Sequence, residues 1–139
     1  MRAVRAVFPG SFDPATQGHL DVARRAAGMF DEVVMCVLTN PAKTGRLPLA
    51  ERLALLTDLT GDLANVTVDS SPGRLLVDYC LGAGIGVIVR GVRTPADLEG
   101  ELPMAHMNRH LSGIETLFVP TSPAKAHISS TLVAATARR

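Results

Sequence analysis

The chain has 139 residues, which is the usual size of one domain, so we expect a single domain over residues 1–139 and no multidomain organisation. Hydrophobic residues make up 47% of the chain and charged residues 19%, a composition that permits a buried core and excludes wholesale disorder. The formal net charge of +1 is far from the strongly basic surface that nucleic acids or anionic membranes attract. Any anion-binding site is therefore expected to be local.

Targeting segments and cysteines point to a simple intracellular protein. No stretch approaches the length of a membrane span, and residues 1–15 lack the apolar segment and cleavage site of a secretory signal. We therefore expect a soluble, cytoplasmic protein that binds neither membrane nor nucleic acid. Cys36 and Cys80 lie in separate apolar segments, without a CxxC pair or a histidine cluster, and we expect both to be reduced core residues.

The predicted elements alternate between strand and helix along the chain. Nearly apolar runs, typical of parallel strands covered on both faces, lie at residues 4–8, 33–38, 66–68, 87–89 and 116–119. Helical spacing of apolar residues predicts helices at residues 20–30, 49–59, 75–83, 96–111 and 129–137. This order predicts an α/β Rossmann-like fold, a doubly wound parallel five-stranded sheet with helices on both faces. Ligands bind such sheets beyond the carboxyl ends of the strands, so functional residues are expected just after strands.

The segment after the first predicted strand has the composition of an anion-binding turn. Gly10 allows a ligand to approach the backbone closely, and Ser11 offers a hydroxyl and an N–H to a phosphate oxygen. Thr16 is a candidate N-cap, which places Gly18 and His19 in the first helical turn, where free N–H groups and the helix dipole favour an anion. A lone histidine at a helix start is usually a surface residue, but this combination favours a phosphate site.

The tetrad Thr16-Gln17-Gly18-His19 after a Gly-rich turn resembles the signature of the nucleotidyltransferase superfamily. No Walker GxxxxGK[ST] sequence and no GxGxxG fingerprint occurs. Within the superfamily, the chain resembles the bacterial phosphopantetheine adenylyltransferases over nearly its whole length. The matching segments follow the family order: FPGSFDPATQGHLD at residues 8–21, NPAK at 40–43, RGVR at 90–93, DLEGE at 97–101, AHMNRH at 105–110 and ISST at 128–131.

This resemblance implies transfer of the adenylyl group of ATP to 4′-phosphopantetheine, giving dephospho-coenzyme A and pyrophosphate in coenzyme A synthesis. The residue types fit that chemistry, because a phosphate nucleophile needs no general base, whereas two anions held in line need cations and N–H donors. The family also implies direct in-line displacement and a homohexamer. Magnesium is the expected cofactor, because it neutralises the triphosphate and the leaving pyrophosphate.

The resemblance also implies roles for individual residues. The predicted catalytic residues are His19, which stabilises the transition state, and Lys43 and Arg90, which hold the phosphopantetheine phosphate. Ser11 is expected to contact both substrates, and Leu76 the pantetheine arm. The remaining predicted ATP contacts are Phe12, Gly91, Val92, Arg93 and Glu101, together with a loop of Lys125, Ala126, His127, Ile128, Ser129, Ser130 and Thr131.

Plainer interpretations remain open for several of these residues. Lys43 in a polar loop could be solvated, Leu76 could belong to the core, and residues 129–131 could simply cap the last helix. Arg90 and Arg93 are more telling, because two guanidinium groups around a glycine at a strand end suit bidentate binding of phosphate.

Two further histidines, His106 and His110, lie one helical turn apart, a spacing that could bind a metal. No third ligand is evident, so we predict no protein metal site and expect surface or interface histidines.

The resemblance weakens near the carboxyl end of the chain. Gly100 and Pro103 replace common family residues, and an internal proline costs a helix about 3 kcal/mol or more. This predicts a helix that begins late or kinks and displaces Glu101. Lys125 stands where the family often has Trp, and the family's C-terminal helix is expected to be missing. Two alternatives stay open: another small nucleotidyltransferase with a different phosphate acceptor, or a non-catalytic module that binds a nucleotide or coenzyme A.

Overall fold

The structure, a computed structural model, describes residues 3–40, 42 and 45–121. Strands and helices alternate along this part of the chain in the order β1 (Arg5–Gly10), α1 (Gln17–Ala27), β2 (Glu32–Thr39), α2 (Leu49–Leu59), β3 (Val66–Pro72), α3 (Leu76–Ala83), β4 (Val87–Val92), α4 (Pro95–Ser112) and β5 (Glu115–Pro120). The five strands form one parallel sheet in the order β3-β2-β1-β4-β5. The predicted doubly wound α/β fold is confirmed, while the helix predicted at 129–137 lies outside the described residues.

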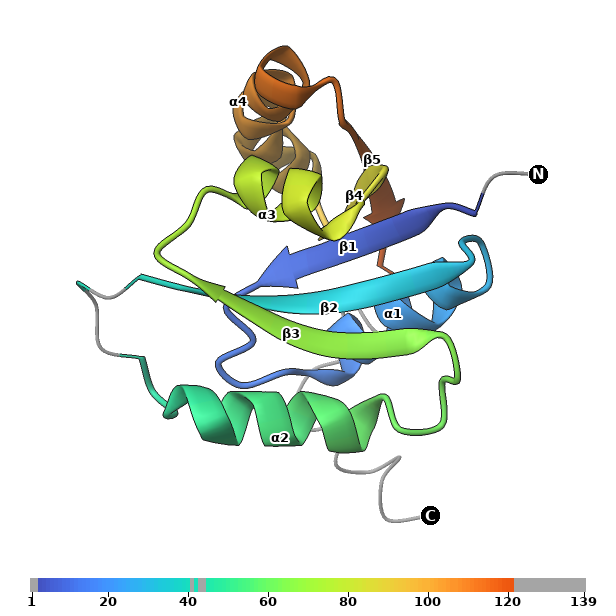
Figure 1. The fold of residues 1–139 in the computed structure, drawn as a ribbon, viewed down its shortest axis with the longest axis vertical. Helices are drawn as coiled ribbons and strands as arrows, with labels where there is room; N and C mark the ends of the chain where they lie inside the picture. Colours follow the sequence, from blue (N-terminus) through green and yellow to red (C-terminus); the bar gives the residue numbers. More distant parts are fainter. Residues whose placement is uncertain (1–2, 41, 43–44, 122–139) are drawn as a thin grey trace.

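Helices cover both faces of the sheet (Figure 1). One core cluster packs α1 and α2 against alternate residues of the central strands, among them Phe8 and Met35. The other packs Tyr79 and Cys80 of α3 against the opposite face, where Val7 points. Successive residues of a strand point to opposite faces, so strands covered on both sides need the almost continuous apolar runs that the sequence contains.

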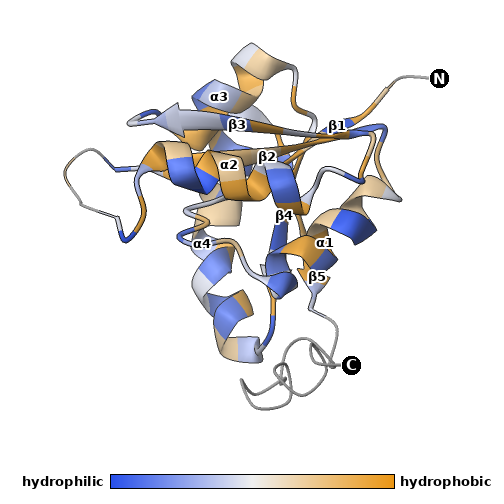
Figure 2. Cartoon of the chain, turned by 90° about the horizontal axis from the view of Figure 1, so that it is seen from below, coloured by the Kyte–Doolittle hydropathy of each residue, from blue (hydrophilic) through white to orange (hydrophobic). Residues whose placement is uncertain are grey.

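Figure 2 shows the same division by hydropathy, with mainly hydrophobic central strands between helices that mix hydrophobic and hydrophilic residues. The cysteines are free and buried, as expected. Burial raises the pKa of Cys36 to about 12 and that of Cys80 to about 11, so both thiols stay protonated. Among the helices of the described residues, none combines the length and the apolarity that crossing a membrane requires.

Two strands, β3 and β4, continue past the apolar runs that predicted them. β3 continues to Pro72 because its polar second half pairs with β2, with Ser70 opposite Val37. β4 continues to Val92 and pairs with β5 as far as Pro120. Arg90 therefore lies inside β4, and Arg93 is the first residue after it.

The expectation of a late start for the helix containing Pro103 is wrong. α4 begins at Pro95, where the Thr94 hydroxyl accepts the N–H of Asp97 at 3.1 Å, and it continues through Pro103 to Ser112. Proline at the first helical position is favourable, and Gly113, with φ of 78°, ends the helix in the left-handed region. Pro103 is exposed, so water can solvate the carbonyl that its missing N–H leaves unpaired.

The strand order reverses between β1 and β4, which are neighbours in space although two other strands separate them in sequence. Chains leaving the carboxyl ends of these two strands turn to opposite faces of the sheet. The opening between them is where doubly wound proteins bind their ligands. This topology brings the turn after β1 beside the end of β4.

Candidate active site

The turn after β1 places Ser11 at the surface and buries the ring of Phe12. Phe12 has a positive φ of 45°, and its side chain is 1% exposed. The ring packs edge-on against His19, with 4.9 Å between ring centroids, and against Phe8 at 5.4 Å. A Cβ on Gly10 would lie 3.3 Å from the Phe12 ring, so glycine permits this close approach. The buried ring supports His19, which leaves the backbone of Phe12 as the part that a nucleotide could reach.

His19 is held in the first turn of α1 by a reciprocal capping box. The Thr16 hydroxyl accepts the N–H of His19 at 3.3 Å, and the Thr16 N–H donates to Nδ1 of His19 at 2.9 Å. Because Nδ1 accepts a hydrogen bond, the neutral imidazole carries its proton on Nε2. The predicted N-cap is confirmed, and it also sets the tautomer of the histidine.

Burial lowers the pKa of His19 below its ordinary 6.5, and the positive charges of Arg90 and Arg93 lower it further. The imidazole is therefore neutral at pH 7 and offers an Nε2–H donor rather than a full charge. The influence of both guanidinium groups on the histidine means that the end of β4 and the start of α1 share one electrostatic environment. An anion entering here meets two cations, the histidine N–H and the amino end of a helix.

Arg90 is fixed by two partners on different elements. Its Nε and Nη2 donate to the two carboxylate oxygens of Glu101 at 2.7 and 3.0 Å, and Nη1 donates to the carbonyl of Pro9 at 2.6 Å. A guanidinium group has five N–H bonds. Among the described residues these contacts use three of them, which leaves one on each terminal nitrogen for a phosphate. Glu101, expected to contact ATP, here orients Arg90, and Pro103 does not displace it.

Of the three residues that follow Arg90, the first two are held in place and the third is exposed. A Cβ on Gly91 would lie 3.1 Å from Cγ2 of Val22, so glycine lets α1 pack closely on β4. The carbonyl of Val92 accepts both the N–H and the hydroxyl of Thr121, at 2.8 and 3.0 Å. The side chain of Arg93 is 66% exposed, with Nε 3.5 Å from a carboxylate oxygen of Asp97. This exposure leaves the guanidinium of Arg93 accessible to a bound anion, in spite of its long ion pair with Asp97.

A second set of contacts, which the sequence interpretation missed, ties this turn to the segment before α2. The carboxylate of Asp13 accepts the N–H of Arg46 at 2.7 Å and that of Leu47 at 2.8 Å. Arg52 of α2, only 7% exposed, donates to the carbonyl of Ser11 at 3.1 Å and to that of Leu47 at 3.1 Å. A usable signal was present, because Arg52 lies four residues before Leu56 and so on the apolar face of its helix.

Other predicted residues fall outside this cluster. Lys43 and the loop 125–131 lie outside the described residues. Leu76, the first residue of α3, is half-buried and packs against a core cluster, which favours its plainer interpretation. His106 and His110 are both exposed on α4. In the described part of the chain, no three His, Cys, Asp or Glu side chains gather in a way that could hold a metal ion.

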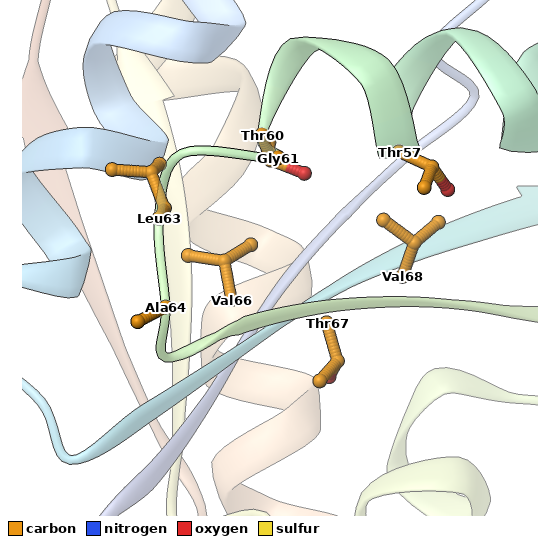
Figure 3. Close-up of a pocket in the computed structure, with 8 residues that line it drawn as sticks. All are labelled: Thr57, Thr60, Gly61, Leu63, Ala64, Val66, Thr67 and Val68. Carbon is orange, nitrogen blue, oxygen red and sulfur yellow. The ribbon is translucent and has the colours of Figure 1, made fainter.

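A pocket of about 450 Å³ lies away from these groups, between the carboxyl end of α2 and the amino half of β3 (Figure 3). It is lined by Thr57, Thr60, Gly61, Leu63, Ala64, Val66, Thr67 and Val68. Among the described residues, no charged side chain and no histidine lines this pocket. Transfer of a charged group needs cations, so we assign the chemistry to the residues around His19 instead.

Comparisons with known proteins identify the family of this chain. Residues 7–136 match the family model described as cytidylyltransferase-like. A phosphopantetheine adenylyltransferase of Arthrobacter sp. (strain FB24) is 50% identical over 129 residues, which cover 93% of this chain and 81% of the relative. The enzyme of the same name from Corynebacterium diphtheriae is 54% identical over 129 residues, covering 92% of this chain and 80% of that protein.

Solved structures show the same fold at low sequence identity. A lipopolysaccharide core biosynthesis protein from Thermoplasma volcanium GSS1 superimposes with a TM-score of 0.61 at 21% identity, covering 87% of this chain and 98% of its own. A NadR protein in complex with NR gives a TM-score of 0.60 at 16% identity, covering 96% of this chain and 42% of its own. The solved structures show the fold, and the sequence comparisons show the family. This chain belongs to the cytidylyltransferase-like family and, within it, to the phosphopantetheine adenylyltransferases.

Proposed function

We propose that this chain transfers the adenylyl group of ATP to 4′-phosphopantetheine and releases pyrophosphate, which makes dephospho-coenzyme A. The observation that carries the proposal is that Arg90 of β4 reaches the end of β1, where its Nη1 donates to the Pro9 carbonyl at 2.6 Å. The charges of Arg90 and Arg93 act from there on His19 at the start of α1 and help to keep it neutral. The named relatives at 50% and 54% identity supply the substrate class.

The chemistry follows from charge. A phosphate oxygen of the acceptor attacks the α-phosphorus of ATP, and the bond from that phosphorus to the bridging oxygen breaks, so pyrophosphate leaves with the electron pair. The attacking phosphate is already an anion, so no side chain has to remove a proton. Catalysis therefore depends on alignment and on donors aimed at the oxygens where charge develops.

The described residues divide this work. The Nε2–H of His19 and the first N–H groups of α1 face the nucleotide phosphates, since both lie at the amino end of that helix. The two N–H bonds that Arg90 has left suit the acceptor phosphate, and the exposed Arg93 suits the nucleotide. Ser11, the backbone of Phe12, Gly91 and Val92 are the remaining proposed contacts of the nucleotide in the described part of the chain.

Magnesium is proposed to enter with ATP, as part of the substrate. The nearby carboxylates of Asp13 and Glu101 are already engaged, one by two backbone N–H groups and the other by Arg90. The described residues therefore do not fit a protein-held ion, and phosphate oxygens and water are its natural ligands.

Lys43 and residues 125–131 keep their proposed substrate roles from the family resemblance. Leu76 packs against a core cluster, and the pantetheine contact is proposed for the part of its side chain that stays exposed. We also propose a cytoplasmic homohexamer. An exposed apolar row on one face of α4 supports assembly, with Met104, Met107 and Leu111 being 62%, 51% and 55% exposed. Light scattering of the purified protein tests this, and a monomer at micromolar concentration would contradict it.

The decisive experiment mixes the protein with ATP, magnesium and 4′-phosphopantetheine and searches for dephospho-coenzyme A by mass spectrometry. His19→Ala is expected to keep the fold and to lower turnover on the order of 100- to 1000-fold, as for loss of a donor to a developing oxyanion. His106→Ala, at an exposed histidine of α4, is the matched control and should leave turnover unchanged.

Two other outcomes identify the alternatives. Pyrophosphate release with nicotinamide mononucleotide or an alcohol phosphate, but not with 4′-phosphopantetheine, indicates a different acceptor. Calorimetric binding of ATP with no product from any acceptor indicates a non-catalytic module.

A further inference from the structure

Three residues outside the phosphate-facing set form what we call the Asp13–Arg52 clamp: Asp13, Gly45 and Arg52. Asp13 lies in the turn between β1 and α1, Gly45 precedes α2, and Arg52 projects from the first half of α2. The clamp joins two segments about thirty residues apart, because Asp13 binds the N–H groups of Arg46 and Leu47 while Arg52 binds the carbonyl of Ser11. It therefore connects the catalytic turn to a helix that carries no proposed substrate contact in the described part of the chain.

Both charged groups of the clamp are held by hydrogen bonds to the backbone. Nε and Nη1 of Arg52 each donate to a carbonyl oxygen at 3.1 Å, and the carboxylate of Asp13 accepts N–H groups at 2.7 and 2.8 Å. Desolvation acts to raise the pKa of Asp13, but the two N–H donors and the charges of Arg52 and Arg46 together lower it. A buried arginine is costly to desolvate and stabilises a fold no better than a well-packed apolar residue. The role of Arg52 here is therefore to fix the positions of the two carbonyl groups that it binds.

Gly45 shows how little space the clamp leaves. A Cβ at this position would lie 2.8 Å from Oδ2 of Asp13 and 3.2 Å from Nη2 of Arg52. Any side chain would therefore push the carboxylate or the guanidinium from its place. Gly45 allows both charged groups to approach the same stretch of backbone.

The carbonyl that Arg52 holds belongs to the peptide between Ser11 and Phe12. This peptide is trans, since the only cis bond among the described residues joins Asp13 and Pro14. In a planar trans peptide the C=O and N–H point in opposite directions. When the Ser11 carbonyl points to Arg52, the N–H of Phe12 must point away from α2. The same peptide contains the backbone nitrogen of Phe12, so its orientation also affects where the Phe12 ring packs against His19.

We propose that Asp13 and Arg52 are positioning residues for the adenylyl transfer: they lock the Ser11–Phe12 peptide so that the Phe12 N–H faces a substrate phosphate and the Phe12 ring braces His19. The inference rests on the proposed function, which supplies the substrates. Neither residue touches the reacting atoms. A displacement of a positioned donor by about 1 Å is enough to lower a rate about 100-fold, so the expected effects are large.

The test compares graded changes to the clamp with a matched control. Arg52→Gln removes the positive charge and cannot donate to both carbonyl oxygens as arginine does. Arg52→Lys keeps the positive charge. Gly45→Ala keeps both charged residues but places a Cβ against them. Gly28→Ala is the control, because Gly28 ends α1 with an ordinary φ of −78° and a Cβ there meets nothing closer than 3.5 Å. We expect kcat to fall on the order of 10- to 100-fold in Arg52→Gln and Gly45→Ala, partial recovery in Arg52→Lys, and no change in Gly28→Ala.

Separate readouts distinguish positioning from stability. Urea unfolding confirms that each variant is folded at the assay temperature, and NMR follows the Phe12 amide and the His19 ring. Lowered kcat in a folded variant, together with shifted Phe12 and His19 resonances, supports the proposal. Wild-type kcat in folded Arg52→Gln and Gly45→Ala overturns it, whatever their melting temperatures.

The wild-type assay separates this proposal from the function on which it rests. If the wild-type protein makes no dephospho-coenzyme A, the proposed function fails, and the clamp is judged by calorimetric binding of ATP alone. Weaker binding by Arg52→Gln than by Gly28→Ala then supports positioning of the phosphate-facing N–H. Equal affinities overturn it.

Discussion

Replacing Glu101 by Gln tests whether this carboxylate serves Arg90 or the nucleotide. In the structure its two oxygens accept Nε and Nη2 of Arg90 at 2.7 and 3.0 Å. Glutamine has one oxygen that can accept and one NH2 group that can only donate, so one hydrogen bond and the negative charge are lost. The NH2 group also faces an N–H of the guanidinium, which places two donors against each other. Hydrogen bonds to charged groups contribute about 1.5–3 kcal/mol. The two side chains are 32% and 30% exposed, so solvent weakens the pair and the lower end, about 1.5–2 kcal/mol, applies.

The expected kinetic result follows from the role of Arg90. Since 1.4 kcal/mol corresponds to a factor of ten, kcat/KM for 4′-phosphopantetheine should fall about 10- to 30-fold in Glu101→Gln. The KM for ATP should stay unchanged, because Glu101 acts through Arg90 and Arg90 is assigned to the acceptor phosphate. The hydrogen bond from Arg90 to the Pro9 carbonyl remains, which limits the displacement of the guanidinium.

Pyrophosphate release measures both constants when one substrate is varied at a saturating concentration of the other. Glu99→Gln, at an exposed glutamate of the same helix, is the matched control and should behave like the wild type. A raised KM for ATP with unchanged kinetics for 4′-phosphopantetheine would refute the reasoning. That result would return Glu101 to the nucleotide contact that the family resemblance implies.

Three further outcomes check other parts of the structure. NMR titration of His19 should give a midpoint below 6.5, because burial and then Arg90 and Arg93 disfavour the imidazolium, and Arg90→Met should raise it; an unmoved midpoint contradicts that coupling. Since the folded pKa is lowered, the contribution of His19 to stability is present above pH 6.5 and is lost as pH falls through the folded pKa. Gly91→Ala should destabilise by about 1–3 kcal/mol in urea unfolding, since its Cβ would lie 3.1 Å from Val22; wild-type stability would show that α1 shifts freely. Gly100→Ala should stabilise α4 by about 0.5–1 kcal/mol, because nothing lies within 4 Å of a Cβ there, and a loss of stability argues against that open space.

Much of this protein could be predicted locally. Apolar runs of the right length predicted all five strands, and the Thr16 cap and the following Gly-His pair predicted the amino end of α1. These features depend on residues close in sequence, where strand alternation, helix periodicity and capping operate. The strand ends were predicted less well, because the polar halves of β3 and β4 are held by pairing with neighbouring strands.

Only the tertiary structure decided how the charged residues are used. Glu101 lies eleven residues from Arg90 and on another element, yet both its oxygens bind that guanidinium. Phe12 looked available to a nucleotide, but the backbone at φ of 45° turns its ring into the core beneath His19. Arg52 gave a weak signal as a charge on an apolar helix face, and its partner, the Ser11 carbonyl, is 41 residues away. Sequence determines which groups exist and which local conformations they favour, whereas the direction of a guanidinium or a peptide N–H depends on hydrogen bonds that form only when the sheet brings distant segments together.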